Sequence, residues 1–188
     1  MHTNTYLIQR QKNKIRERFN EKSKNWKMWY AILDVKTCRD CRKKHGSIYQ
    51  MNETPNPKPP LHFSCRCDIV KMRAILAGNA TKNGVNGADW YLKYYGRLPS
   101  YYIDSKSAKK SGWKPELGNL AEIVPNHMVI GGIYYNDDGK LPDKQGRIWY
   151  EADINYVSGY RNKERILFSN DGLLFVTYDH YSTFCEIV

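Results

Sequence analysis

The sequence lacks any apolar run long enough to cross a membrane. None of its 188 residues belongs to a stretch approaching the roughly 18–20 consecutive apolar residues that a spanning helix needs. Its opening residues, MHTNTYLIQRQKNK, are polar and carry no apolar signal region. We therefore expect no membrane anchor and no ordinary secretion signal.

Acidic residues are scarce in the first part of the chain. Residues 1–78 contain 17 Lys and Arg against 6 Asp and Glu, whereas residues 79–188 contain 13 of each kind. The formal net charge of +11 therefore comes entirely from the N-terminal part. A basic segment favours RNA, DNA or an anionic surface through counterion release. A charged helix that is merely solvated explains the same composition.

Cysteine is also scarce, but four of the five cysteines are clustered. Cys38 and Cys41 form a C-x2-C knuckle, and a proline-rich loop then leads to His62, Cys65 and Cys67. These ligand types suit a tetrahedral structural zinc site formed by Cys38, Cys41, Cys65 and either His62 or Cys67. Disulfides are disfavoured because a Cys-x-Cys pair bridges poorly and no signal peptide is present. Unligated cysteines remain an alternative.

The composition is that of a folded chain with an internal boundary. Hydrophobic content of 41% and aromatic content of 13% exclude a disordered chain. The length allows one large or two small domains. Glycine and asparagine are concentrated in residues 71–87, which indicates a linker. We expect a basic helix with a small Cys/His module over residues 1–70, and a second domain over residues 88–188.

The N-terminal part begins with a helical pattern. Four apolar residues lie among many Lys and Arg: Ile8, Ile15, Phe19 and Trp26. They are seven, four and seven residues apart. This spacing predicts one amphipathic helix over residues 4–28. The next segment, Trp29–Val35, reads as a strand. His45 lies in Lys-Lys-His-Gly and is expected at the surface rather than as a metal ligand.

Helix signals come first in residues 88–188 and strand signals come last. Three helices are expected, over 88–95 before Gly96, from Asp104 or Ser105 to Gly112, and from Asn119 to just before Pro125. Strands are expected over Tyr150–Tyr156, Arg165–Ser169 and Leu173–Tyr178, with a hairpin turn at Ser169–Gly172. This order predicts the α+β class, with N-terminal helices packed on a C-terminal antiparallel β-sheet.

The strand-rich segment Ile148–Phe184 carries the residue types of a reaction centre. They are one carboxylate, two arginines and one histidine: Glu151, Arg161, Arg165 and His180. In a strand, Glu151, Asp153 and Asn155 share one polar face. A base, an acid and bidentate anion-binding groups are what phosphodiester cleavage by internal transesterification requires. The nucleophile of that reaction is a 2′-hydroxyl, so the substrate is RNA, and no metal is needed.

The sequence motifs of this segment distinguish it from the chance occurrence of a surface carboxylate and a structural, hydrogen-bonded histidine. EADINY, SG-aromatic-RN, ERIL and DHY-x-TF, with the hairpin between them, resemble the barnase and binase family of bacterial ribonucleases. The resemblance continues back through GKLP at Gly139, IGG at Ile130 and GNLA at Gly118, and covers roughly Asn79–Val188. It implies the microbial-ribonuclease fold and an endoribonuclease that cleaves single-stranded RNA, without a cofactor, to 2′,3′-cyclic phosphates and then 3′-phosphates.

The resemblance also implies roles for individual residues. The general base falls on Glu151 and the general acid on His180. The phosphate-binding arginines fall on Arg161 and Arg165. The ring of Tyr181 falls at the base pocket, where stacking on a purine is expected.

Two departures from the family pattern affect the expected site. The family's functional lysine falls on Ser105, and Lys106 follows one residue later, a shift that turns a helical side chain by about 100°. The base-recognition loop has Asp137 and Asp138 where the family has an arginine and a glutamate. Asp138 can still accept from a guanine edge, but guanine preference stays open. The expected base-binding residues are Tyr134, Asn136, Asp138 and Tyr181.

A second resemblance covers the cysteine region. TC-x2-C, HG and PPLHFSCRC, over about Trp29–Val70, resemble the end of the phage Mu F-type head morphogenesis (MuF) domain. Such domains precede interchangeable effectors in polymorphic toxins, so the two resemblances imply a ribonuclease toxin with phage-head or toxin-delivery partners. They also imply a dedicated, acidic, barstar-like immunity protein. We expect delivery by a non-classical or phage-associated route and action in the cytoplasm of a target cell.

Two other functions are compatible with parts of the sequence. A virion structural or nucleic-acid-binding protein would need only the basic segment and the zinc knuckle, with an inactive ribonuclease-like domain. The complete set of Glu151, Arg161, Arg165 and His180 argues against it. A metal-dependent nuclease in the cysteine region lacks the carboxylate or histidine pair that such chemistry needs.

Overall fold

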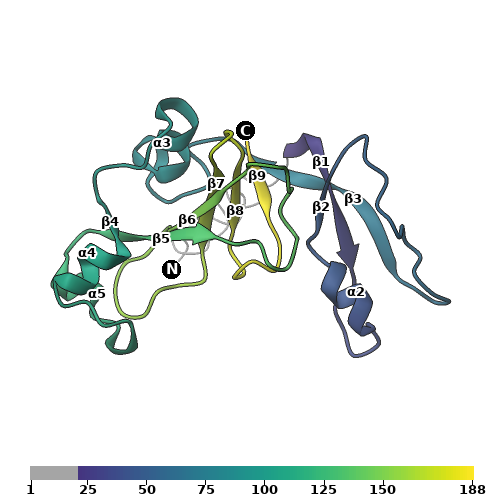
Figure 1. Ribbon diagram of the computed structural model, residues 1–188, viewed down its shortest axis with the longest axis horizontal. Helices are drawn as coiled ribbons and strands as arrows, with labels where there is room; N and C mark the ends of the chain where they lie inside the picture. The colour runs from purple at the N-terminus through teal and green to yellow at the C-terminus, as the bar shows by residue number, and fades with distance from the viewer. Residues whose placement is uncertain (1–20) are drawn as a thin grey trace, which may run out of the picture.

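A computed structural model describes residues 21–188 of the chain. Within these residues nine strands form one sheet (Figure 1). The strands are β1 (Glu21–Ala31), β2 (Ile48–Gln50), β3 (Cys67–Ile75), β4 (Tyr102–Asp104), β5 (Met128–Tyr134), β6 (Trp149–Asp153), β7 (Arg165–Ser169), β8 (Leu174–Thr177) and β9 (Cys185–Ile187). The helices are α2 (Arg39–Lys44), α3 (Ala88–Tyr95), α4 (Ser105–Lys110) and α5 (Leu120–Ile123), with 3-10 turns at Gly84–Asn86 and Pro115–Leu117. No helix among these is long and apolar enough to cross a membrane.

The sheet is mixed and runs in the order β2-β1-β3-β9-β8-β7-β6-β5-β4. From β9 to β5 every pairing is antiparallel. β3 with β9 and β4 with β5 are parallel, so the prediction of an antiparallel sheet is wrong at these two places. Parallel neighbours need a long crossover, which α4 and α5 supply between β4 and β5. The α+β class is confirmed.

The first described strand replaces the last part of a predicted helix. β1 pairs with both β2 and β3, so the helix predicted over residues 4–28 is wrong from residue 21 onward. The earlier residues of that prediction lie outside the described part of the chain. β1 contains a bulge, and its buried residues Ser23, Trp26 and Trp29 fall three apart. A regular strand buries every second residue, and the bulge interrupts that alternation. Of the four apolar residues that predicted the helix, only Trp26 lies in β1, and one buried residue fits a strand as well as a helix.

Three local predictions need correction. The strand expected over Trp29–Val35 ends at Ala31. The linker expected over residues 71–87 begins later, because β3 continues to Ile75 and pairs with β9. His45, predicted at the surface, is buried, and its Nδ1 accepts a hydrogen bond from Ala31 N at 3.0 Å. The N-terminal strands thus continue the main sheet, and a division into separate domains stays a prediction.

A buried carboxylate fixes the glycine-rich segment that follows β3. Asp89, in the first turn of α3, is fully buried. It accepts hydrogen bonds from Gly78 N at 2.7 Å, Ala80 N at 2.9 Å and Thr81 Oγ1 at 2.8 Å. Backbone and hydroxyl donors of this kind compensate the cost of burying the charge. The segment is therefore attached to α3.

The predicted helix boundaries in residues 88–123 agree with the structure. α3 ends at Gly96, whose φ of 65° gives the left-handed cap that glycine adopts without strain. Asp104 caps α4 by accepting a hydrogen bond from Ser107 N at 2.8 Å. Asn119 precedes α5.

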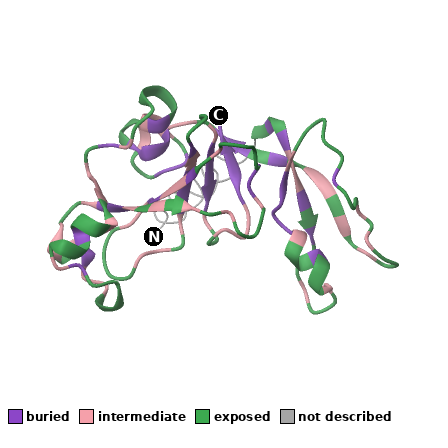
Figure 2. Cartoon of the chain, in the orientation of Figure 1, coloured by how far each residue is buried: buried purple, intermediate pink, exposed green. Residues whose placement is uncertain are grey.

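The central strands are buried on both faces, and Figure 2 shows buried residues along them. Alternate residues of β7 and β8 divide between two clusters, with Ile166 and Val176 in one and Leu167 and Phe175 in the other. The first cluster contains Leu92 of α3. The second contains one residue from each N-terminal strand: Trp26 of β1, Ile48 of β2 and Met72 of β3. A smaller cluster joins α4 and α5 to β5.

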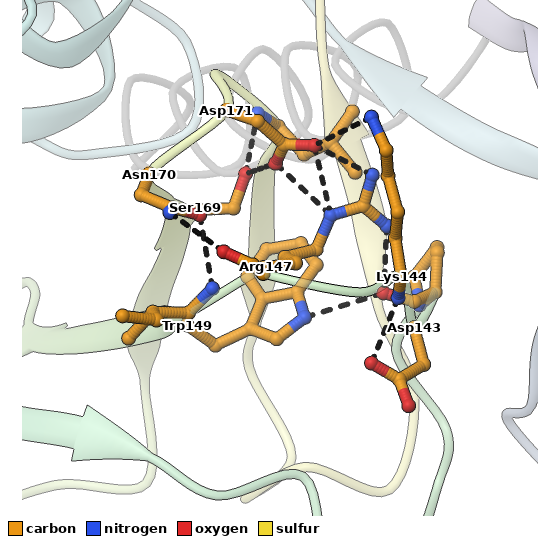
Figure 3. Close-up of polar contacts among 11 residues, drawn as sticks. Asp143, Lys144, Arg147, Trp149, Ser169, Asn170 and Asp171 are labelled. Carbon is orange, nitrogen blue, oxygen red and sulfur yellow. Dashed lines mark hydrogen bonds and ion pairs between the residues drawn. The ribbon is translucent and has the colours of Figure 1, made fainter.

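The predicted hairpin turn at Ser169–Gly172 is present between β7 and β8. Figure 3 shows how Arg147 binds its tip: Nε lies 2.9 Å from Asp171 Oδ1, and Nη2 lies 2.8 Å from Oδ2. Ser169 Oγ donates to the same carboxylate at 2.6 Å. The hydrogen bonds from Arg147 and Ser169 hold the pKa of Asp171 well below its usual range. The turn is therefore fastened to the segment before β6.

Replacing Asp171 with Asn removes this charge. Because the pKa of Asp171 is lowered in the fold, its contribution is present above the ordinary value of 3.8 and is lost as the pH falls toward the folded pKa. We expect D171N to reduce the free energy of unfolding by about 1 kcal/mol at neutral pH, a value discounted for partial exposure. Urea unfolding at several pH values should show the difference shrinking below about pH 4. D143N is the exposed control, and a D171N effect that did not change with pH would contradict the account.

Candidate active site

The carboxylate of Glu151 rests against a glycine of the neighbouring strand. A Cβ on Gly131 of β5 would lie 2.3 Å from Glu151 Oε1, so a larger residue at 131 would displace the carboxylate. Tyr181 Oη donates to Glu151 Oε2 at 2.5 Å. The side chain of Glu151 is partly buried, so one side of the carboxylate is packed and the other faces solvent. A carboxylate in this position can accept a proton from a bound molecule.

Asp153, on the same strand as Glu151, binds both predicted arginines. Its carboxylate is fully buried and accepts from Arg161 Nε at 2.8 Å and Arg161 Nη2 at 2.6 Å. Arg165 Nε forms an ion pair with Asp153 Oδ1 at 3.0 Å, without hydrogen-bond geometry. Arg165 Nη1 also donates to the backbone oxygens of Asn162 at 2.8 Å and Glu164 at 2.7 Å. One carboxylate therefore fixes two guanidinium groups.

Asp153 is not among the predicted site residues. The strand pattern puts it on the same face as Glu151, but a contact with arginines in the next loop and strand depends on tertiary structure. The available signal was a carboxylate within a strand pattern, a position where an unpaired charge would be costly. That signal indicates a partner without identifying it.

His180 and Tyr181 lie in the loop between β8 and β9 and have an unusual backbone. Their φ values are 57° and 66°, in the left-handed region that costs a residue with a side chain of the order of 1–3 kcal/mol. Tyr181 N donates to Thr177 Oγ1 at 2.9 Å, and His180 N donates to Lys163 O at 3.2 Å. The side chain of His180 is exposed. An exposed imidazole is free to exchange protons with a ligand.

A hollow beside Glu151 is lined by all four residues that the sequence analysis assigned to base binding: Tyr134, Asn136, Asp138 and Tyr181. The rings of Tyr134 and Tyr181 are stacked, with centroids 5.2 Å apart and planes 22° apart. Burial and the hydrogen bond to Glu151 raise the pKa of Tyr181, so its hydroxyl remains a donor. The hollow therefore combines an aromatic platform with carboxylates.

The loop that borders this hollow is closed by its own side chains. Asn136 Nδ2 donates to Leu141 O at 3.0 Å, and Leu141 N donates to Asn136 Oδ1 at 2.9 Å. Asp138 Oδ2 lies 3.5 Å from Lys140 Nζ. Asp137 is exposed. Asn136 therefore shapes the loop, and its contact with a base stays a prediction.

Lys106 is not brought into contact with the other predicted residues. It lies in the first turn of α4 and is exposed. Within residues 21–188 its side chain has no hydrogen bond or ion pair with Glu151, Arg161 or His180. The position of the family's functional lysine is therefore occupied by Ser105, and Lys106 follows it by one residue, as in the sequence.

The second half of the chain matches known ribonucleases. Residues 88–188 match the family model described as ribonuclease. A protein named Ribonuclease from Heyndrickxia coagulans is 46% identical over 108 residues, which make up 57% of this chain and 99% of that protein. The chain belongs to the ribonuclease family. Proteins with the same name from Bacillus intermedius and Bacillus pumilus are also 46% identical over 108 residues, covering 67% of each.

Family membership confirms the resemblance predicted from the sequence, and with it the prediction of an endoribonuclease. The N-terminal part of this ribonuclease matches a second family model, described as Phage Mu protein F like protein, over residues 2–70. That resemblance is also confirmed, and the match extends further toward the N-terminus than the predicted start at Trp29.

The cysteines of the MuF-like part of the ribonuclease lie together with a histidine. His62 Nε2 is 3.2 Å from Cys38 Sγ and 3.4 Å from Cys41 Sγ, and Cys41 Sγ is 3.6 Å from Cys65 Sγ. Cys67 completes a second triad with Cys41 and Cys65. All five cysteines of the chain are free thiols, so the disulfide alternative is not realised. Ligand atoms around a tetrahedral zinc ion lie about 3.5–3.8 Å apart, which these separations approach.

Replacing Asp153 with Asn would leave Arg165 buried without its counter-ion. We expect D153N to lower the free energy of unfolding by about 3–5 kcal/mol, because breaking a buried pair leaves an uncompensated charge. Urea denaturation with fluorescence detection measures this loss. D104N is the control, since Asn caps a helix as well as Asp does and Asp104 is exposed. Equal stability of D153N and wild type would contradict the role of Asp153.

Proposed function

We propose that this ribonuclease cleaves single-stranded RNA by transesterification without a catalytic metal ion. The observation that supports it most is the gathering of two guanidinium groups around Asp153, two residues from Glu151 on the same strand face. Guanidinium groups bind phosphate oxygens in bidentate fashion, and a neighbouring carboxylate can take a proton. The stacked tyrosines beside Glu151 offer a surface for a base.

Two proton transfers accompany the reaction. Glu151 takes the proton of a ribose 2′-hydroxyl, and the 2′-oxygen forms a bond to phosphorus. The bond from phosphorus to the 5′-oxygen breaks, and His180 protonates the departing oxygen. The product is a 2′,3′-cyclic phosphate. Water then opens it to a 3′-phosphate, with His180 as base and Glu151 as acid.

The arginines stabilise the negative charge that develops on the phosphate oxygens. Arg161 and Arg165 carry two positive charges against the single negative charge of Asp153, so this phosphate-binding group keeps one positive charge beside the carboxylate of Glu151, although residues 79–188 are neutral overall. The side chain of Arg161 is 28% exposed and that of Arg165 is 5% exposed. Arg161 is therefore the arginine that meets substrate, and Arg165 acts from behind it.

The base beside the cleaved bond stacks on the tyrosine pair. A purine covers the outer ring of this stack better than a pyrimidine does. Asp138, held by Lys140, accepts hydrogen bonds from the edge of guanine. Guanine is therefore the base that we propose for this position.

RNA cleavage with identification of the product ends tests this mechanism. We expect wild type to produce 2′,3′-cyclic phosphates from a defined single strand in magnesium-free buffer with chelator, cut after guanine. E151A and H180A should each lower the rate by about 10²–10⁴-fold, because each removes one proton transfer. E116A and H127A are matched controls outside the site. Unchanged rates in E151A and H180A, or 5′-phosphate products, would contradict the proposal.

The N-terminal match supports a context for this activity. We place the ribonuclease at the effector end of a phage-head-related or polymorphic toxin that acts in the cytoplasm of a target cell. Its producer then needs an acidic inhibitor of the barstar type, since such a protein complements the positive phosphate site. A structural, nucleic-acid-binding role is the second candidate, favoured by the match of residues 2–70 to a phage protein family.

The cluster of cysteines and His62 is proposed as a structural zinc site. Cys41 belongs to both triads of ligand atoms: its Sγ contacts His62 and Cys65, and its backbone N–H donates to Cys38 Sγ. Sulfur and imidazole ligands select zinc, and a closed set of four leaves no position for substrate. The ion would connect α2 to the start of β3, two elements that β2 and a long loop separate in the chain.

Metal content of purified variants tests the zinc site. We expect one zinc ion per chain in wild type and in C185S, which removes a distant thiol. C41S should lose the metal and melt at a lower temperature. H62A and C67S identify the fourth ligand, because only the variant of a true ligand loses zinc. A metal-free wild type, or full occupancy in C41S, would contradict the site.

A further inference from the structure

Residues Gly46–Ile48, at the start of β2, contact two loops of the candidate active site. Ile48 N donates to Lys140 O at 2.8 Å, although Lys140 belongs to the loop that borders the base hollow. Gly46 has a φ of +88°, and a Cβ on it would lie 2.1 Å from Ser182 O. Only a glycine allows this approach. The N-terminal part of the chain therefore contacts the loop of His180 and the loop of Lys140 at once.

Lys140 joins these two loops to each other. Its Nζ donates to Tyr181 O at 3.0 Å and lies 3.4 Å from Ser182 O. The same ammonium group lies 3.5 Å from Asp138 Oδ2. Its side chain is mostly buried, with 16% of its surface exposed. A buried ammonium with three oxygen partners is a fixed connection rather than a surface charge.

Apolar packing reinforces the contact. Trp26, Ile48 and Met72 are buried in one cluster with residues of the nuclease sheet and its loops: Leu141, Trp149, Leu167, Phe175 and Phe184. Tyr134 and Tyr181 pack against this cluster. The stacked tyrosines therefore rest on a layer that the N-terminal residues complete.

We infer that the segment Gly46–Ile48 is a positioning element of the ribonuclease, which acts through Lys140 to hold Tyr181 and its loop. His180 and Tyr181 adopt left-handed backbone conformations, which persist only where the surroundings impose them. The Heyndrickxia coagulans ribonuclease matches this chain over 99% of its own length but only 57% of this chain, so it has no counterpart of the N-terminal part. The support is thus an addition in this chain, and its effect on catalysis rests on the proposed function.

A pair of glycine variants isolates the contact at Gly46. G46A and G172A impose the same backbone strain, since the φ values are +88° and +91°, but an added Cβ at Gly172 meets nothing within 4 Å. We expect G46A alone to lower kcat/KM for single-stranded RNA by about tenfold or more, mainly through KM, because it disturbs the base platform. Hydrogen exchange at the Tyr181 and Thr183 amides should become faster in G46A and stay unchanged in G172A.

A lysine series tests the connection from Lys140 to Tyr181, through which the N-terminal segment acts, and it can overturn the inference even if G46A does not fold. We expect K140M to raise KM and speed exchange at the Tyr181 amide, K140R to restore both in large part, and K144M to match wild type. Unchanged KM and exchange in K140M would overturn the inference, as would G46A and G172A behaving alike. Hydrogen exchange can be measured without activity. If exchange is faster in G46A and K140M but the wild type cleaves no RNA, the positioning role is supported and the proposed function is contradicted.

Discussion

The pairing of Asp153 with two arginines is the constraint on which the site depends. A carboxylate with no exposed surface and a guanidinium with 5% exposed side chain are each very costly to bury alone. Arg161 and Arg165 must therefore meet Asp153: Arg165 does so from the neighbouring strand β7, and the loop between β6 and β7 brings Arg161 back to Asp153. This requirement brings positive charge to the polar face where Glu151 lies.

Close packing around Glu151 adds orientation to this charge. Gly131 leaves the space that the carboxylate fills, and Tyr181 donates to its other oxygen. The ring of Tyr181 also belongs to the tyrosine stack that we propose as the base-binding surface, so in this proposal one residue couples base binding to the position of the general base. Lys140 then connects the backbone of Tyr181 to the loop of Asn136 and Asp138, and the N-terminal strands contact that connection through Ile48.

The sequence predicts those features that local chemistry determines. The cap at Asp104, the left-handed end at Gly96 and the hairpin before Gly172 each depend on a few adjacent residues, and all three agree with the structure. Long-range features were missed. The predicted helix reached into β1 through Trp26 alone, and nothing local indicates that β3 pairs with β9. The site residues came from motifs, whereas the role of Asp153 required the tertiary contacts.

In the proposed mechanism, the Glu151 carboxylate and the His180 imidazole share the proton transfers of RNA cleavage. The most direct measurement is kcat/KM against pH for a guanosine-containing dinucleotide, in wild type and H180A. The account predicts a bell-shaped profile for wild type, because the base must be ionised and the acid protonated, and loss of the alkaline limb in H180A. A wild-type rate that rises continuously into the alkaline range, as hydroxide attack produces, would contradict it.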